Sequence, residues 1–277
     1  MGKTMHEDEV RTRVRERYGA IAREAESCCA PSCCSPEMAP DGLNVIGDAY
    51  AGVAGHVADA DLNLGCGVPT QHAALKRGET VLDLGSGAGN DVFIARHEVG
   101  AEGRVIGVDM TPDMIARARA NARKLGFGNV EFRLGEIEHL PVESGSIDAI
   151  ISNCVLNLLP DKAPAFIEMF RVLKPGRRFC VSDIVATGPL PHGVREAAEL
   201  YVGCVAGALP EKEYLALINT AGFEGVWNAK EQPISLPDEA LTPHMSANEI
   251  AAFRASGVQL KSVTVLGTKP PQLENSA

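Results

Sequence analysis

The feature that most constrains the fold is a regular alternation of short apolar runs and helical segments between residues 79 and 185. Five runs rich in Val, Ile and Leu have strand length: 81–84, 104–109, 130–134, 147–152 and 178–185. The segments between them predict helices, one with Thr111 as its N-cap, Pro112 at its first position and Gly126 at its end. Strands that alternate with helices predict an α/β protein with a doubly wound, mostly parallel sheet and right-handed crossovers.

The flanking regions follow a different pattern. Residues 10–25 have apolar positions spaced for one helix face. Beyond the alternating core we expect helices at 194–209 and 211–221, a strand at 226–234, helical or irregular chain at 236–255, and a last strand at 258–268 that pairs antiparallel with its predecessor. The expected organisation is an N-terminal helical arm (1–60), a central domain (61–192) and a smaller α+β C-terminal region (193–277).

Charge and hydropathy exclude several classes of partner. The chain carries 26 basic and 36 acidic residues, a net charge of −10. Nucleic acids and anionic membranes are bound by surfaces with an excess of positive charge, so neither is expected as a partner. No apolar run approaches the length of a membrane span, and residues 1–18 lack the apolar segment of a secretory signal. We therefore expect a soluble, cytoplasmic protein.

A glycine-rich turn follows the first predicted strand. The sequence Asp83-Leu-Gly-Ser-Gly-Ala-Gly89 has the spacing G-x-G-x-G, and Asn90 stands where the dinucleotide fingerprint G-x-G-x-x-G requires glycine. Glycines at a strand-to-helix turn let backbone N–H groups approach a ligand. Asp109 follows at the end of the second strand, where an acidic side chain can accept hydrogen bonds from ribose hydroxyls. The turn predicts a nucleotide-like cofactor.

These motifs resemble those of the class I S-adenosylmethionine (SAM) methyltransferases. The resemblance rests on residues 81–89, 107–109 and 173–176, and on the segment 135–141, which meets the adenine in that family. Glu136 replaces the usual Asp of that segment and keeps an acceptor. The resemblance implies a Rossmann-like fold and these cofactor-binding residues: Asp83, Gly85, Ser86, Gly87, Gly89, Asp109, Met110, Glu136, Ile137 and Asn153.

Eight cysteines are the unusual part of the composition. In a reducing compartment cysteines serve as reactive thiols, as ligands for soft metals, or as small buried hydrophobic residues. Cys154 follows the fourth predicted strand and should point toward the cofactor, while Cys66 lies in a glycine-rich loop and Cys204 on the predicted helix 194–209. Packing and ligand roles both stay open for these three. Cys180, inside the fifth predicted strand, is expected to pack in the core.

The segments around these three cysteines resemble the cysteine motifs of arsenite SAM-dependent methyltransferases. They are 63–69, 151–158 and 201–208. The resemblance implies methyl transfer from SAM to trivalent arsenic, a soft centre that thiolates bind well, in arsenic detoxification. It implies that Cys154 and Cys204 bind arsenic and that Cys66 is the third ligand or the redox partner. Arsenite and methylarsenite are then the substrates, a thiol reductant (thioredoxin or glutathione) restores the thiols, and no tightly bound metal cofactor is expected.

Two other interpretations of the sequence differ in the role they give to the cysteines. A methyltransferase acting on carbon or oxygen of a lipophilic small molecule, of the quinone or sterol type, would use the cysteines only for packing. A non-enzymatic thiol protein would sequester arsenic or zinc through the cluster Cys28, Cys29, Cys33 and Cys34, but it would leave the glycine turn without a role. That cluster itself is compatible with zinc binding, capture of arsenic, a disulfide relay, or exposed thiols without a function.

Overall fold

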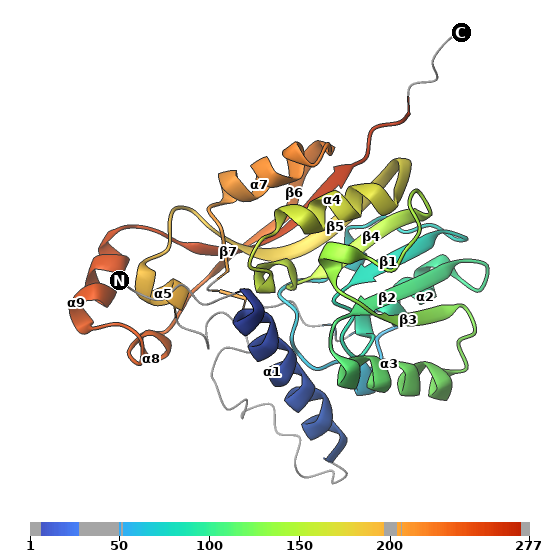
Figure 1. The fold of residues 1–277 in the computed structure, drawn as a ribbon, viewed down its shortest axis with the longest axis horizontal. Helices are drawn as coiled ribbons and strands as arrows, with labels where there is room; N and C mark the ends of the chain where they lie inside the picture. Colours follow the sequence, from blue (N-terminus) through green and yellow to red (C-terminus); the bar gives the residue numbers. More distant parts are fainter. Residues whose placement is uncertain (1–6, 28–49, 51, 197–203, 206, 273–277) are drawn as a thin grey trace.

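One seven-stranded sheet organises the computed structural model, in the order β3-β2-β1-β4-β5-β7-β6 (Figure 1). The structure describes residues 7–27, 50, 52–196, 204–205 and 207–272. Five neighbouring strands run parallel: β1 (Thr80–Leu84), β2 (Arg104–Asp109), β3 (Val130–Leu134), β4 (Ile147–Asn153) and β5 (Leu173–Ala186). The predicted doubly wound parallel sheet is confirmed. Its order reverses between β1 and β4, and in such sheets ligands bind at the carboxyl ends of the strands beside the reversal.

The last two strands extend the same sheet. β7 (Leu260–Thr268) pairs antiparallel with β5 along its length, and β6 (Glu224–Ile234) pairs antiparallel with β7. The predicted antiparallel pairing of these strands is confirmed. Because β7 lies against β5, the C-terminal part of the chain contributes directly to the packing beside the parallel strands.

Helices cover both faces of the sheet (Figure 1). α4 (Ala163–Val172) and α7 (Glu211–Thr220) pack on one face, and α2 (Asn90–Val99) and α3 (Pro112–Leu125) pack on the other. Successive strand residues therefore divide between two cores: Leu82 and Leu84 face α4 and α7, while Val81 faces α2. The short helices are η1 (Ala58–Ala60), η2 (Pro69–Gln71), η3 (Ile137–His139), η4 (Leu156–Leu158), α5 (His192–Glu196), α8 (Asp238–Leu241) and α9 (Ala247–Ala255).

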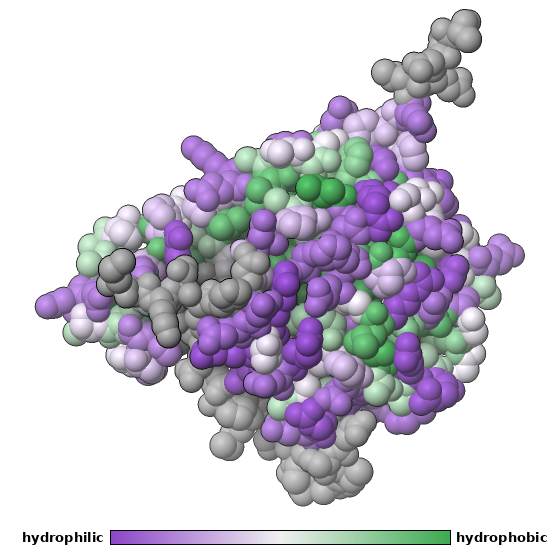
Figure 2. Space-filling view, viewed as in Figure 1, coloured by the Kyte–Doolittle hydropathy of each residue, from purple (hydrophilic) through white to green (hydrophobic). Residues whose placement is uncertain are grey.

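The N-terminal helix α1 (Glu7–Ser27) packs against α3 and confirms the helix predicted there (Figure 1). Val10, Val14 and Ala22 are its buried apolar residues. Its outer surface is hydrophilic in the space-filling view (Figure 2). Among the described residues, no helix combines the length and the apolar character needed to cross a membrane.

Three local predictions need correction. The helix predicted over 194–209 is wrong at its C-terminal end: residues 194–196 are helical in α5, residues 197–203 and 206 lie outside the described residues, and Cys204 lies in a turn with φ +63°, which an α-helix excludes. Gly207 explains the compact turn, because a Cβ there would lie 1.9 Å from the Asn157 carbonyl oxygen. β5 begins at Leu173, so 174–176 belong to the strand. α3 starts at Pro112 as predicted, but the Thr111 side chain makes no capping hydrogen bond.

Candidate functional site

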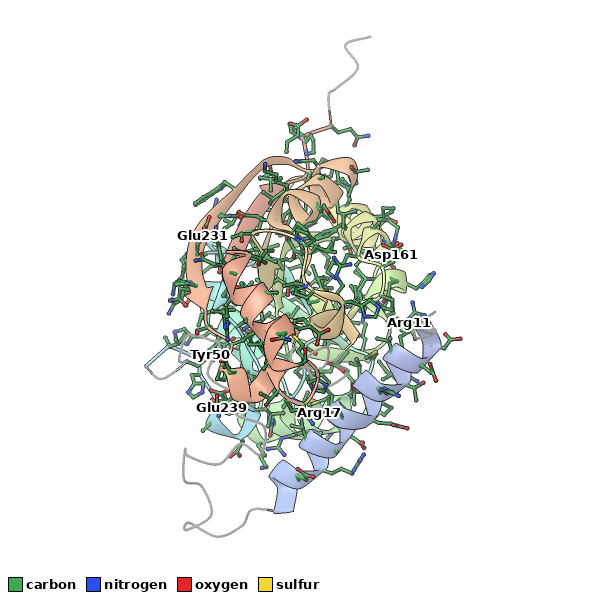
Figure 3. All side chains as sticks on the ribbon, turned by 90° about the vertical axis from the view of Figure 1, so that its left-hand side faces the viewer. Arg11, Arg17, Tyr50, Asp161, Glu231 and Glu239 are labelled. Atoms are coloured by element: carbon green, nitrogen blue, oxygen red, sulfur yellow. The ribbon has the colours of Figure 1, made fainter. Side chains whose placement is uncertain are left out.

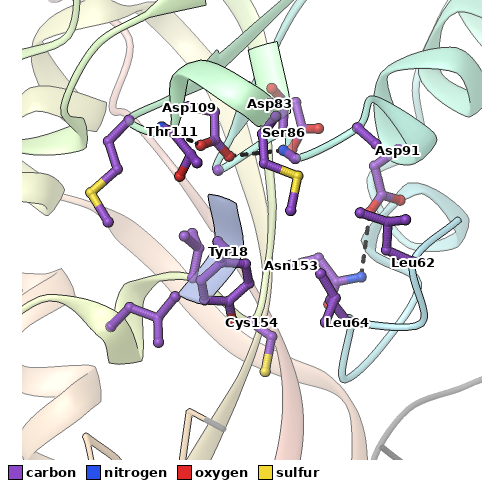
Figure 4. A pocket seen from close by; sticks show the side chains of 18 of the residues that line it. Tyr18, Leu62, Leu64, Asp83, Ser86, Asp91, Asp109, Thr111, Asn153 and Cys154 are labelled. Atoms are coloured by element: carbon purple, nitrogen blue, oxygen red, sulfur yellow. Dashed lines mark hydrogen bonds between the residues drawn. The ribbon is translucent and has the colours of Figure 1, made fainter. Parts of the chain in front are cut away.

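A pocket lies at the carboxyl ends of β1, β2 and β4, and α1 forms one of its walls (Figure 4). Its empty space, about 1100 Å³ with the solvent at its open mouth included, is of the size of a small-molecule site. Arg11 on α1 and Tyr50 both line the pocket, and Figure 3 labels them on opposite sides of its view. The pocket gathers these predicted site residues: Asp83, Gly85, Ser86, Gly87, Asp109, Met110, Glu136, Ile137, Asn153 and Cys154.

The glycine turn has the open backbone that a bound cofactor needs. Gly87 has φ +50°, and a Cβ there would meet no atom within 4 Å, so this part of the turn is open. Asp109 holds the turn in place, because its carboxylate accepts hydrogen bonds from the N–H groups of Gly87 (2.9 Å) and Thr111 (2.8 Å). Gly89 does not line the pocket; a Cβ there would lie 2.8 Å from the Phe132 ring.

Three buried carboxyl groups give the pocket an acidic end. Burial raises the pKa of Asp83 well above its ordinary value, and the nearby Asp91 and Asp109 raise it further. Burial likewise raises the pKa of Asp91 to about 6, against the lowering effect of hydrogen bonds from Tyr50 and Asn153. The pKa of Asp109 is raised, mainly by burial. Desolvated carboxylates of this kind are stabilised by a cationic ligand.

Polar atoms on the pocket wall are left for a ligand to satisfy. Ser86 Oγ, Asn90 Oδ1, Asp91 Oδ1 and Arg11 Nε are buried and have no hydrogen-bond partner within the described parts of the chain. Unpaired buried polar atoms are costly, so several of them around one cavity indicate a polar ligand. A nucleoside with an amino-acid side chain and a positive charge, such as SAM, fits both these atoms and the acidic end.

The three predicted thiols lie in one buried cluster, and of the three only Cys154 lines this pocket. Cys154 directly follows β4 and lines the pocket, and its thiol lies within hydrogen-bonding reach of the thiols of Cys66 and Cys204. The Cys204 thiol donates to the Cys154 carbonyl oxygen at 2.6 Å. Cys154 (φ +57°) and Cys204 both have left-handed backbones, a strained conformation for cysteine that is common at functional sites.

Burial and thiol contacts favour the protonated forms of Cys66 and Cys154. Hydrogen bonds with the Cys204 and Cys66 thiols raise the pKa of Cys154 well above its ordinary value, and burial raises it further. Burial raises the pKa of Cys66. Cys180 lies apart from this group: its thiol donates to the Pro69 carbonyl oxygen (3.3 Å) in the core beneath α2, as predicted for a packing residue.

Sequence reasoning missed Tyr18. Its hydroxyl lies within hydrogen-bonding reach of the Cys204 thiol, and its pKa is raised, first by burial and then by the neighbouring cysteines. Figure 4 shows its ring between Asp109 and Cys154. α1 is held over the pocket by ion pairs from Arg11 to Glu138 (2.9 Å) and from Arg15 to Glu136 (3.5 Å). The helical spacing of Val14 and Tyr18 indicated a buried face, but no sequence signal indicated what that face covers.

A second missed group lies behind the thiols. Burial raises the pKa of Asp183 to about 7. Its carboxyl accepts hydrogen bonds from the Tyr214 hydroxyl (3.3 Å) and the Ile184 N–H (3.0 Å). Lys162, whose pKa is lowered by burial, donates to the Gly207 carbonyl oxygen (2.9 Å) and so fixes the turn that carries Cys204. These residues are far apart in sequence and match no motif.

Two further predictions have a limited outcome. The cluster Cys28, Cys29, Cys33 and Cys34 lies outside the described residues. Within the described residues, no group of three His, Cys, Asp or Glu side chains has an arrangement that could already hold a metal ion. The three thiols are therefore neighbours without having the geometry of a preformed metal centre.

Comparisons with known proteins identify the family. Residues 75–222 match the family described as a methyltransferase domain. The arsenite methyltransferase of Halobacterium salinarum is 45% identical over 95% of this chain and 67% of its own length. That of Aquipseudomonas alcaligenes is 37% identical over 86% of this chain and 67% of its own length.

A solved structure agrees with these two relatives. It is an arsenic(III) SAM methyltransferase from Chlamydomonas reinhardtii, which is 33% identical and superimposes with a TM-score of 0.66 over 86% of this chain and 77% of that one. The chain spans about two thirds of the length of the two curated relatives. It belongs to the methyltransferase-domain family and, within it, to the arsenite methyltransferases.

Proposed function

We propose that this chain transfers methyl groups from SAM to trivalent arsenic held by Cys66, Cys154 and Cys204. One observation carries the proposal: Cys154 lines the cofactor pocket and also lies within hydrogen-bonding reach of the other two thiols. Thiolates are the soft ligands that arsenic(III) prefers. An arsenic atom bound at Cys154 would therefore lie beside a cofactor in the same pocket.

The pocket residues have distinct roles toward the cofactor in this proposal. SAM supplies an electrophilic methyl group on a positively charged sulfur. Asp83 and Asp91 would offset its positive charge, and Asp109 would accept hydrogen bonds from the ribose hydroxyls. Glu136 and Ile137 would contact the adenine, with α1 excluding water from that end.

Arsenic binding needs no base from the protein. Each thiol replaces one hydroxyl of arsenious acid, and its proton leaves with that hydroxyl as water. The three thiols do not have the geometry of a preformed metal site. They would therefore bond to arsenic one after another. The thiol-bound arsenic keeps its lone pair, which attacks the methyl group while the C–S bond of SAM breaks. Orientation is the main contribution of the protein to the rate.

The electron balance requires a reductant. Methyl transfer formally oxidises arsenic(III) to arsenic(V), and two electrons return it to the trivalent state. Two protein thiols supply them by forming a disulfide, which an external thiol (thioredoxin or glutathione) then reduces. Cys66 is the candidate for this step or for the third arsenic ligand. The proposal sets the reaction in the cytoplasm, where such thiols are abundant, and divides the work between a cofactor domain (61–192) and a C-terminal region (193–277) that carries Cys204.

Product analysis with two substrates tests the proposal. Cys154→Ser should abolish methylation of both arsenite and methylarsenite, because arsenic is then held by too few ligands to be aimed at the methyl group. Cys66→Ser should lose activity on arsenite and keep activity on methylarsenite, which has only two hydroxyls to exchange. Cys180→Ala is the matched control, because it removes a buried thiol outside the pocket, and it should keep both activities.

The same assay distinguishes the alternative. The arsenic products are separated and quantified after incubation with SAM and excess thiol. Full activity of Cys154→Ser on arsenite would remove arsenic from this site and favour a methyltransferase acting on carbon or oxygen of a lipophilic small molecule.

A further inference from the structure

We propose that Asn153 is the positioning residue for Cys66 and thereby determines whether arsenic can take a third thiol ligand. The inference rests on the proposed function. Asn153 ends β4 and immediately precedes Cys154. A side chain at this position that also holds the Cys66 loop fixes two of the three thiols relative to each other.

The contacts of Asn153 show that its amide is committed to the Cys66 loop. Its Oδ1 accepts hydrogen bonds from the backbone N–H groups of Cys66 (3.0 Å) and Gly67 (3.3 Å). Its Nδ2 donates to the Gly67 carbonyl oxygen at 2.7 Å. These bonds span 86 and 87 positions of sequence, so they hold together two segments that are distant in the chain.

The glycines on either side of Cys66 fit this arrangement. A Cβ on Gly65 would lie 2.5 Å from Asn153 Nδ2, and a Cβ on Gly67 would lie 2.6 Å from Ser182 Oγ. Neither glycine has a left-handed backbone. Glycine is therefore required at both positions by close approach, because the loop is inserted between Asn153 and Ser182.

The same amide also contacts the cofactor pocket. Asn153 Nδ2 lies 2.5 Å from the Tyr50 hydroxyl and 3.3 Å from Asp91 Oδ2, and the Tyr50 hydroxyl donates to Asp91 at 2.6 Å. Both polar atoms of Asn153 thus bond to protein, although the residue lines the pocket (Figure 4). The geometry assigns the Asn153 side chain mainly to holding the Cys66 loop. Its contact with Asp91 connects that loop to the cofactor pocket.

Binding measurements with two arsenicals test this assignment without relying on turnover. Arsenite can bond to three thiols and methylarsenite to two. Asn153→Ala should weaken arsenite binding by about tenfold, as the loss of more than one hydrogen bond implies, and leave methylarsenite within about twofold. Adding Asn153→Ala to Cys66→Ser should cause no further loss for arsenite, because both changes act on one ligand. Equilibrium dialysis with quantification of arsenic gives both affinities.

Asn157→Ala is the matched control. Asn157 is a buried asparagine in the same segment, and its Nδ2 donates to the Ile184 carbonyl oxygen (2.6 Å). Its backbone carbonyl lies against Gly207 in the turn that carries Cys204, so this segment supports Cys204 instead of the Cys66 loop. Truncation of the Asn157 side chain should weaken the binding of both arsenicals alike and leave the ratio of their affinities unchanged. Thermal melting and SAM calorimetry on every variant separate these effects from a general loss of structure.

Gly65→Ala supplies a second variant that removes no hydrogen-bonding group. Its added methyl group should displace the Cys66 loop and lower arsenite affinity selectively, and the loss should shrink in an Asn153→Ala background, where the clash is absent. An unchanged ratio of the two affinities in folded Asn153→Ala or Gly65→Ala would overturn the assignment. If the wild-type chain bound neither arsenical, the proposed function itself would fail instead.

Discussion

The buried thiols predict how arsenite binding responds to pH. The pKa values of Cys66 and Cys154 are both raised, the first by burial and the second by thiol hydrogen bonds and burial. Both thiols are therefore protonated in the free protein between pH 6 and 8. When neutral arsenious acid condenses with them, each proton leaves in a water molecule and none is exchanged with the solvent. These two groups should make arsenite affinity independent of pH.

A divalent cation provides the contrast. Cd²⁺ displaces both protons into solution, and each released proton raises affinity tenfold per pH unit, so two give about 100-fold per unit, or about 2.7 kcal/mol. If the two thiols were ionised in the free protein, arsenite would take up two protons, and its affinity would fall about 100-fold per pH unit. The slope of log affinity against pH thus distinguishes the two protonation states.

Equilibrium dialysis at pH 6, 7 and 8 under argon, with a reductant that is not a thiol, gives the slope. The chain should carry Cys28, Cys29, Cys33 and Cys34 replaced by Ser, so that only Cys66, Cys154, Cys180 and Cys204 are present. Cys154→Ser in that background is the control and should remove most of the binding. A steep fall in arsenite affinity as the pH rises would refute the reasoning, because it would require ionised thiols in the free protein.

Four further predictions follow from the same geometry. Asp109→Ala should weaken SAM binding by about 1.5–3 kcal/mol, the value of hydrogen bonds to a charged group, and calorimetry measures it; unchanged affinity in a folded variant would place Asp109 outside the site. Tyr18→Phe should weaken arsenite binding by about 1 kcal/mol, because it removes one hydrogen bond to Cys204, and it should leave SAM affinity unchanged. Equal losses of affinity for both ligands would mean that the hydroxyl instead supports the pocket as a whole. Because the pKa of Asp91 is about 6 and SAM is positively charged, SAM affinity should fall as the pH drops below 6, more steeply than that of the uncharged-sulfur product S-adenosylhomocysteine; parallel profiles would contradict a role for the acidic end. The pKa of Asp183 is raised to about 7, so its contribution to stability is complete below the unfolded pKa near 4 and is lost as the pH rises through 7. The free energy of unfolding should therefore fall by about 2 kcal/mol between pH 5 and 7 because of this group. Denaturant unfolding of Asp183→Asn should show a shallower pH dependence, and an unchanged pH dependence would exclude Asp183 as the group responsible.

The sequence by itself determined the features that depend on neighbouring residues. Strand runs such as 104–109 and 130–134 agree with β2 and β3 because short runs with β-branched residues, bounded by turn residues, are typical of strands. The glycine turn that begins after Asp83 was identifiable because its backbone requires glycine at fixed positions. The three cysteines inside the motifs could be proposed as ligands because thiols are the soft ligands among side chains.

The tertiary structure decided what depends on contacts between distant segments. The sequence predicted the helix of α1 but not its place over the pocket, because an apolar face does not specify what it covers. The sequence predicted a helix at Cys204, whereas the structure has a turn there, and Gly207 lies close against the Asn157 backbone. The bonds from Asn153 to the Cys66 loop leave no local signal, since they form only after the sheet brings residues 86 and 87 positions apart together. Local propensity is read from adjacent residues, whereas the geometry of this site is set by long-range packing.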